Sequence, residues 1–247
     1  MRYLLLGVIV VAIIGCGGSH KASGPSAPSL ATTCGTLPPG LHATTSWLTA
    51  DDGVRIYAAT AGEGDRVVVL AHESGGLGLC GWIPTMQLLA AQGIRTVAFD
   101  FRGTYPSPLP PVRVEDDWRD DVQAAIDAAD AKKLVVMGAS FGGAVVVADG
   151  SRLHGVDGIV SLSGEPAIPT RHIDAIGNVG RLRVPLLVVA SRLDGYLDEA
   201  HARQLVRRAG SADKQVAVFP GRAHGWDILK EPRASRLVVA WITRRLQ

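Results

Sequence analysis

Five residues in the middle of the chain, Gly138-Ala139-Ser140-Phe141-Gly142, have the G-x-S-x-G spacing that places a nucleophilic serine on a sharp turn. An apolar segment precedes the serine and a helix-like segment follows it. Bulky neighbours two residues away would collide with the strand or the helix, and Gly138 and Gly142 remove those collisions. The N–H of Phe141 would lie at the positive end of the helix. Because this pattern also recurs by chance, it indicates a catalytic serine only if the chain also supplies an acid, a base and an oxyanion-binding loop in the right order.

A serine nucleophile needs a base and an acid, and the sequence offers each just after a predicted strand. His224 follows the last predicted strand and is the histidine that chain order places opposite the serine. Asp194 follows the preceding strand, and we expect it to orient the other nitrogen of the imidazole. The resulting order, Ser140, Asp194, His224, is the Ser…Asp…His order of one known arrangement. The nearby Asp198, and Glu165 after an earlier strand, remain alternative acids.

A serine reaction also needs two fixed N–H donors for the oxyanion that forms on the substrate. Phe141, directly after the nucleophile, supplies one of them. The other is expected from the loop His72-Glu73-Ser74-Gly75-Gly76, which follows the first buried strand. The glycines of this loop let the backbone come close to a substrate oxygen.

The elements that position these residues alternate between strand and helix from Val67 onward. Asp52-Gly53 predicts a hairpin between the first two strands. The expected strands are 44–48, 54–59, 66–71, 95–99, 134–137, 158–162, 185–190 and 215–219, and four of the expected helices are 82–91, 141–149, 200–209 and 231–245. A further helix is expected with the acidic residues 115–117 in its first turn and one apolar stripe made of Trp118, Val122, Ala125, Ile126 and Ala129. This alternation is typical of a parallel sheet with helices on both faces. Ligands bind at the carboxyl ends of such strands, so the candidate residues should gather at one edge of the sheet.

The composition is that of a globular protein with no electrostatic match for nucleic acid. The chain has 247 residues, of which 47% are hydrophobic, and its net charge of +2 comes without a long basic run. No H-x-x-H or H-E-x-x-H spacing supports a metal site. We therefore expect a small-molecule substrate, with no nucleic-acid partner, no metal and no cofactor. The sequence does not indicate an oligomeric state.

The first residues have the pattern of an export signal. Arg2 precedes an apolar run of twelve residues, Tyr3 to Ile14, whereas a bilayer span needs about 20. The segment ending at Cys16 resembles a bacterial lipobox, in which the cysteine carries lipid, so we expect an exported protein anchored to the cell membrane. Ordinary secretion, with cleavage near Gly18, is the alternative. The expected divisions are a signal peptide at 1–15, a flexible tether rich in small and polar residues at 16–43, and a folded domain at 44–247.

Two further cysteines remain if Cys16 carries lipid. An exported protein is found where disulfides persist, so we expect Cys34 and Cys80 to pair. The bridge would pin the end of the tether to the loop after the first core strand. Two unrelated free thiols are the alternative, which thiol titration of the denatured, unreduced protein distinguishes.

Taken together, the segment from Thr44 to Gln247 resembles an α/β-hydrolase. The matching pieces, in family order, are Leu70-Ala71-His72-Glu73-Ser74-Gly75, Phe99-Asp100-Phe101-Arg102-Gly103, Gly138-Ala139-Ser140-Phe141-Gly142, Asp194 and His224. The resemblance implies an α/β-hydrolase fold with a mostly parallel sheet, and it makes the backbone of Ser74 the second oxyanion donor. The family continues its D-x-R-G signature with x-G-x-S. Here Tyr105 replaces that glycine, which leaves the shape of this loop in doubt.

Glu73 also departs from many members, which have His-Gly at this point. His-Glu is similar to dienelactone-hydrolase-like members, in which the glutamate lies close to the nucleophile. By that resemblance Glu73 would tune the serine or hold a water molecule. The alternative is a loop carboxylate that caps a backbone N–H or pairs with Arg102.

The resemblance implies a serine hydrolase that cleaves a carboxylic ester through a Ser-His-Asp triad and an acyl-enzyme. About twenty residues separate Leu162 from Pro185, where capped members insert far more, so we predict an open site with residues 165–180 as a small flap. The family also includes amidases, peptidases, thioesterases and lactone hydrolases. An acyltransferase and a non-catalytic binding protein remain alternatives.

Overall fold

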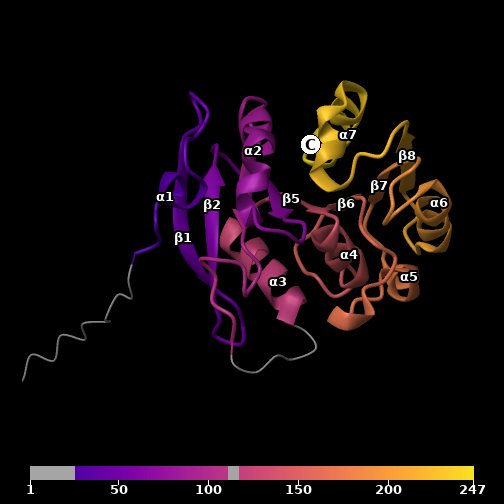
Figure 1. The fold of residues 1–247 in the computed structure, drawn as a ribbon, viewed down its shortest axis with the longest axis horizontal. Coiled ribbons are helices and arrows are strands. Elements are labelled where there is room, and N and C mark those ends of the chain that lie inside the picture. Colours follow the sequence, from indigo (N-terminus) through magenta and orange to yellow (C-terminus); the bar gives the residue numbers. More distant parts are fainter. Residues whose placement is uncertain (1–25, 111–116) are drawn as a thin grey trace, which may run out of the picture.

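The structure, a computed structural model, describes residues 26–110 and 117–247. Within these ranges eight strands form one sheet in the order β1-β2-β4-β3-β5-β6-β7-β8 (Figure 1). The strands are β1 Ala43–Thr49, β2 Arg55–Ala61, β3 Arg66–Ala71, β4 Arg95–Phe99, β5 Lys133–Ala139, β6 Gly158–Leu162, β7 Leu186–Ser191 and β8 Lys214–Phe219. The α-helices are α1 Leu30–Cys34, α2 Ile83–Ala90, α3 Asp117–Ala129, α4 Phe141–Ala148, α5 Ala175–Asn178, α6 Glu199–Arg208 and α7 Pro232–Arg245. Four 3₁₀ turns are η1 Gly78–Trp82, η2 Pro169–Arg171, η3 Val179–Arg181 and η4 Gly225–Lys230.

The strands from β3 to β8 run parallel, and the hairpin β1–β2 is added antiparallel to β4. The predicted hairpin turn is present, because Ala50 N–H donates to the carbonyl of Val54 over 2.9 Å. Gly53 in this turn has a φ of 84°, which favours glycine. The predicted α/β fold with a mostly parallel sheet is confirmed.

The side chains of the central strands alternate between two apolar layers. In β3, Val67 and Val69 pack into the core beneath α3, α4 and α6, whereas Val68 and Leu70 pack beneath α2 and α7. All four side chains are fully buried. A strand that is buried on both faces is expected to be a continuous apolar run, and β3 has this pattern.

The N-terminal part of the domain begins earlier than the sequence predicts. Leu30 of α1 is buried with the α2 and α7 layer, and Ser29 caps the helix through the N–H of Thr32. The hydroxyl of Tyr57 in β2 donates to the Pro28 carbonyl over 3.0 Å. The prediction of a flexible tether through residue 43 is therefore wrong for the part from Pro28 onward, because these contacts hold it against the sheet.

The predicted signal peptide, the lipidation site Cys16 and the first part of the tether lie outside the described residues. Among the helices that are described, none has the length and apolar character needed to cross a bilayer.

A buried ion pair ties the loop after β4 to α3. Arg102 is 2% exposed, and its Nε donates to Asp121 Oδ1 over 2.8 Å. Asp121 Oδ2 also accepts from the backbone N–H of Arg102, so the carboxylate holds both the side chain and the loop. Asp52 in the β1–β2 turn contacts the same guanidinium. Three segments far apart in the sequence are joined at one charged group.

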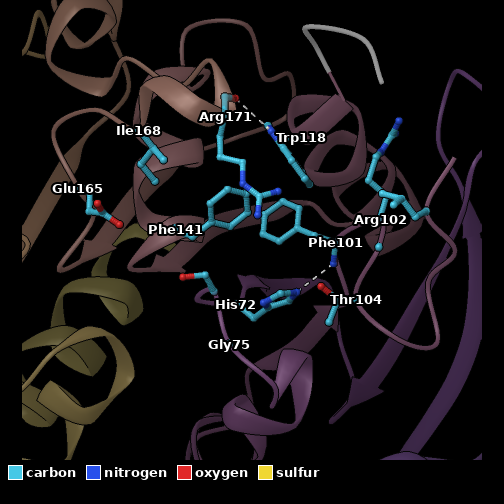
Figure 2. A pocket seen from close by; sticks show the side chains of 13 residues that line it. His72, Gly75, Phe101, Arg102, Thr104, Trp118, Phe141, Glu165, Ile168 and Arg171 are labelled. Carbon is cyan, nitrogen blue, oxygen red and sulfur yellow. Dashed lines mark hydrogen bonds between the residues drawn. The ribbon is translucent and has the colours of Figure 1, made fainter. Parts of the chain in front are cut away.

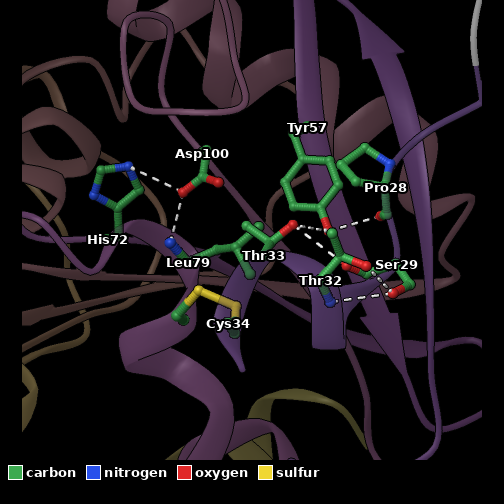
Figure 3. The surroundings of a disulfide bond; sticks show 10 residues. Pro28, Ser29, Thr32, Thr33, Cys34, Tyr57, His72, Leu79 and Asp100 are labelled. Atoms are coloured by element: carbon green, nitrogen blue, oxygen red, sulfur yellow. Dashed lines mark hydrogen bonds and ion pairs between the residues drawn. A yellow bond between two sulfur atoms is a disulfide. The ribbon is translucent and has the colours of Figure 1, made fainter. Parts of the chain in front are cut away.

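Cys34 and Cys80, the pair expected from the sequence, form a disulfide with their Cα atoms 5.4 Å apart (Figure 3). The bridge joins the end of α1 to η1, directly after the loop of residues 72–76. In η1 the N–H of Leu79 also donates to Asp100 Oδ1 over 2.6 Å. The disulfide and this hydrogen bond therefore hold the segment that follows the loop.

We expect the double variant Cys34→Ala/Cys80→Ala to lose about 2–4 kcal/mol of unfolding free energy, because a bridge across 46 residues restricts the unfolded chain. Urea denaturation measured with and without dithiothreitol checks this. Under reducing conditions the wild type should match the variant. A wild-type midpoint that dithiothreitol does not move would show that the bridge contributes nothing.

Candidate active site

Ser140 lies between β5 and α4 in a strained conformation, with φ 47° and ψ −114°. Its N–H donates to the Leu162 carbonyl over 2.8 Å, and its own carbonyl accepts from Ala144 over 2.8 Å. The turn is therefore held from both sides. Non-glycine residues rarely adopt a positive φ, and such strain is found at functional sites.

The two glycines of the motif are required by close backbone contacts. A Cβ on Gly138 would lie 2.3 Å from the carbonyl oxygen of Gly142. A Cβ on Gly142 would lie 2.3 Å from the carbonyl oxygen of Ala71 at the end of β3. These are the strand–helix collisions that the sequence analysis expected.

The side chains of Ser140, His224 and Asp194 form one hydrogen-bonded chain. Ser140 Oγ is 2.7 Å from His224 Nε2, and His224 Nδ1 is 3.0 Å from each carboxylate oxygen of Asp194. The Asp194 side chain is fully buried, while that of His224 is 26% exposed. The backbone N–H of Tyr196 donates to Asp194 Oδ1 over 2.9 Å, which fixes the carboxylate. The imidazole thus bridges a buried acid and the hydroxyl of a serine that is itself 3% exposed.

The two alternative acids lie elsewhere. Asp198 caps α6 and bonds to His201, so it faces away from the imidazole of His224. Glu165 follows β6 and lines a cavity near the site. Burial raises the pKa of Glu165, while the charge of His224 lowers it and that of Asp194 raises it. Neither residue replaces Asp194 as the partner of His224.

Ser74 and Phe141, the residues predicted to supply the oxyanion donors, line one cavity, and Phe141 is labelled on its wall in Figure 2. The Phe141 N–H begins α4, where helix N–H groups have no carbonyl one turn earlier to accept them. Ser74 approaches from the loop after β3. The N–H of Gly142 donates to the His72 carbonyl over 3.1 Å, which locks this loop against the start of α4.

His72 anchors that loop, a role that the sequence analysis did not assign. Its Nδ1 lies 2.6 Å from the carbonyl oxygen of Glu73, and the N–H of Phe101 donates to its Nε2 over 3.1 Å. Burial lowers the pKa of His72 to about 4, so the ring is neutral near pH 7. A neutral ring with a proton on Nδ1 satisfies both contacts. No periodicity in the sequence signals such a histidine.

Aromatic rings form one wall of the cavity, whose volume is about 300 Å³. Phe141 lies between Phe101, at 5.0 Å, and Trp118, at 5.1 Å, in edge-to-face pairs. Residues of the predicted flap, including Ile168 and Arg171, also line the cavity. Trp118, predicted to lie in the apolar stripe of α3, packs in the core and also lines the cavity.

Glu73 is half-buried beside the loop that carries His224. Desolvation raises the pKa of its carboxyl, whereas the backbone N–H of Trp226 and the charge of His224 lower it. A Cβ on Gly225 would lie 1.9 Å from Glu73 Oε2, and this buried oxygen has no hydrogen-bond partner. Arg102 is not among the contacts of Glu73, so the predicted alternative of an ion pair with it is wrong. The contact with Trp226 fits the alternative in which Glu73 caps a backbone N–H.

In the described part of the chain, no group of three or more His, Cys, Asp or Glu side chains is arranged to hold a metal ion.

The model of the alpha/beta hydrolase family matches residues 68–242, a range that includes Ser140, Asp194, His224 and the loop of residues 72–76. The chain belongs to this family. Its fold is similar to that of an esterase from Pyrococcus furiosus, with 16% identity, a TM-score of 0.73, and 90% of this chain and 100% of that chain covered. An esterase from Exiguobacterium antarcticum has 14% identity and a TM-score of 0.69, with 81% and 100% covered. A monoacylglycerol lipase from Paleococcus ferrophilus has 19% identity and a TM-score of 0.66, with 77% and 99% covered.

We expect Gly142→Ala to lower the free energy of unfolding by about 3 kcal/mol, because its Cβ overlaps backbone atoms that cannot move freely. Gly180→Ala is the matched control, since the nearest atom to its Cβ would be 3.6 Å away. Urea denaturation of both variants checks this. Equal stability of the two would mean that the turn relaxes easily and is not constrained by the close contact with β3.

Proposed function

We propose that this protein is a serine hydrolase that cleaves a carboxylic ester, with Ser140 as nucleophile, His224 as base and Asp194 as the orienting acid. The observation that carries the proposal is the chain of hydrogen bonds from Ser140 Oγ, at 2.7 Å, through His224 to the buried Asp194. The strained turn at Ser140 and the position of Phe141 at the start of α4 also support the proposal. Few structural roles require this combination.

In the first half of the reaction, His224 Nε2 takes the proton of Ser140 as Oγ attacks the ester carbonyl. Asp194 accepts a hydrogen bond from Nδ1 and stabilises the imidazolium. The N–H groups of Phe141 and Ser74 bind the oxyanion of the tetrahedral intermediate. The carbon–oxygen bond to the alcohol then breaks, and His224 returns the proton to the leaving oxygen. The product is an acyl-enzyme on Ser140.

In the second half, water replaces the alcohol. His224 removes a proton from the water as its oxygen attacks the acyl carbon, and the same two N–H groups bind the second oxyanion. Collapse of this intermediate releases the acid and returns the proton to Ser140 Oγ. An alcohol that enters instead of water would make the enzyme an acyltransferase.

The solved structures with similar folds support an ester as the bond cleaved, since they include two esterases and a monoacylglycerol lipase. The aromatic wall of the cavity favours an apolar portion in the acyl group. A cavity of about 300 Å³ lies at the small end of the range for ligand sites, which favours a short or medium acyl group. The likeness of His72-Glu73 to dienelactone-hydrolase-like members is consistent with small ester or lactone substrates.

We further propose that the protein is exported and held at the cell membrane by lipid on Cys16. The disulfide between Cys34 and Cys80 supports an oxidising compartment. Secretion without the anchor is the alternative. Retention of a Cys16→Ala variant in the membrane fraction would contradict the anchor.

Hydrolysis of p-nitrophenyl acetate, butyrate and octanoate tests the activity. We expect Ser140→Ala to lower kcat on the order of 10⁵-fold, because the nucleophile acts as a unit with the other two residues. Ser151→Ala, an exposed serine after α4, is the control and should behave as the wild type.

The other outcomes of this experiment discriminate the alternatives. No hydrolysis and no fluorophosphonate labelling of Ser140 would leave a non-catalytic binding protein. Labelling without turnover would leave the triad in place and reject these esters. Ester formation in the presence of an added alcohol would identify an acyltransferase.

We expect Glu73→Gln to change the pH dependence of kcat/KM on its acid side, because the Glu73 carboxyl can lose its charge there and an amide cannot. Burial raises the pKa of this carboxyl, so it loses its charge at a higher pH than an exposed glutamate does. In the variant this component of the profile should be absent. The exposed Glu63→Gln is the control. An unchanged kcat/KM from pH 5 to pH 9 would mean that Glu73 acts only as a cap.

A further inference from the structure

We propose that the acyl group of the substrate carries a free carboxylate, and that Arg171 is the specificity-determining residue that binds it. The substrate class is then a monoester of a short dicarboxylic acid. The inference rests on the proposed ester hydrolysis at Ser140. It is carried by the position of Arg171 on the rim of an aromatic cavity that also contains both oxyanion donors.

Arg171 is held in place by the turn to which it belongs. The strand-like bridge between Ile168 and Ile173 closes this turn, with hydrogen bonds of 2.8 and 3.2 Å. Trp118 Nε1 donates to the Arg171 carbonyl over 3.3 Å. The Arg171 guanidinium carbon lies 5.6 Å from the centre of the Trp118 ring, a cation–π contact. The charge is thus positioned before any substrate arrives.

The guanidinium of Arg171 has no carboxylate within ion-pair distance among the described residues. Figure 2 shows it directed toward the aromatic wall, over Phe101 and Phe141 in that view. A guanidinium offers paired N–H donors that match both oxygens of a carboxylate. On one side of the cavity, therefore, a fixed cation faces the space that a ligand would fill.

The other cations near the cavity are already neutralised. Arg102 also lines the cavity, but its guanidinium is buried against Asp121 and Asp52. His72 is neutral near pH 7, because burial lowers its pKa to about 4. Among the lining residues described, Arg171 is left as the cation available to a ligand.

The cavity holds the acyl side of the ester. Ser74 and Phe141, the oxyanion donors, are among its lining residues, whereas His224 is not. Since His224 must protonate the leaving alcohol, the alcohol departs on the other side of the serine. The group that extends from the carbonyl carbon into the cavity is therefore the acyl chain.

The charged residues that line the cavity also favour one orientation of the acyl chain. Glu165 lines the cavity on the side where it interacts electrostatically with His224 and Asp194. A carboxylate on the acyl chain would be repelled there and attracted to Arg171. A cavity of about 300 Å³ has room for about ten water-sized groups, enough for an acyl chain of five or six carbons with a terminal carboxylate.

The test compares two esters of equal acyl length, mono-p-nitrophenyl glutarate and p-nitrophenyl valerate, with the full-length protein in detergent. The measured quantity is the ratio of kcat/KM for the charged ester to that for the neutral one. Since Arg171 is partly solvated, we expect Arg171→Gln to lower this ratio about tenfold, mainly through KM for the glutarate. Mono-p-nitrophenyl succinate and adipate give the preferred chain length.

Two further variants distinguish a charge effect from a structural one. Arg171→Glu should lower the ratio further than Arg171→Gln, and Arg171→Lys should restore part of it. Arg181→Gln is the matched control, because Arg181 lies in η3 and bonds to Asn178 rather than lining the cavity. Added salt should reduce the wild-type ratio and leave that of Arg171→Gln nearly unchanged.

The outcomes separate this inference from the proposed function. Hydrolysis of both esters that requires Ser140, with a ratio that Arg171→Gln and Arg171→Glu do not change, would overturn the role of Arg171 alone. Failure to hydrolyse either ester while p-nitrophenyl acetate is cleaved in a Ser140-dependent way would overturn this inference alone. Failure on all of these esters together with no fluorophosphonate labelling, or hydrolysis that survives Ser140→Ala, would overturn the proposed function and this inference with it.

Discussion

The backbone of Ser140, with a φ of 47°, imposes a constraint on which most of the site depends. A residue in this conformation costs on the order of 1–3 kcal/mol, so the surrounding structure must hold it. Hydrogen bonds from Ser140 to Leu162 and from Gly142 to His72 provide that support from the ends of β6 and β3, the two strands that flank β5. The close contact between α4 and β3 permits no Cβ at Gly142. The same contact brings the oxyanion loop beside the serine, so the strain and the site have one structural origin.

The parallel sheet explains how residues far apart in sequence meet at that turn. The loops after β3, β5, β7 and β8 carry Ser74, Ser140, Asp194 and His224, and parallel strands bring those loops to one edge. The ends of neighbouring strands are further tied by His72, whose neutral ring links the loop after β3 to the N–H of Phe101 after β4. The buried Arg102 and Asp121 extend this linkage to α3. The site is thus supported by polar contacts that each join two segments of the chain.

The character of the cavity comes from elements outside the group formed by Ser140, His224 and Asp194. Trp118 belongs to α3 and Arg171 to the short flap, yet a hydrogen bond and a cation–π contact join them. In this way a short flap supplies a charged rim to the cavity. Under the proposed function, the residues of ester cleavage and those of acyl-group preference therefore lie in different segments, and the second can change without disturbing the first.

The sequence by itself determined the order of the site and the class of the fold. Gly138, Ser140, Asp194 and His224 were recognisable because each lies just past an apolar strand, and because strands that alternate with helices form parallel sheets. The pairing of Cys34 with Cys80 followed from the lipobox pattern and the compartment it implies. These inferences rest on local pattern and chain order, which the sequence carries directly.

Tertiary structure alone decided which residues surround the serine. The amphipathic pattern of α3 shows that Trp118 faces inward, but it does not reveal that Arg171, 53 residues away, packs against the ring. Likewise, the sequence left Glu73 either to tune the serine or hold a water, or to cap a backbone N–H or pair with Arg102, and only the packing against the Trp226 loop removed the pairing with Arg102. The ordered start near Pro28 was missed because a few contacts with Tyr57 outweigh a composition typical of flexible segments. Periodicity reports which face of an element is buried, whereas the partner that covers it depends on the whole fold.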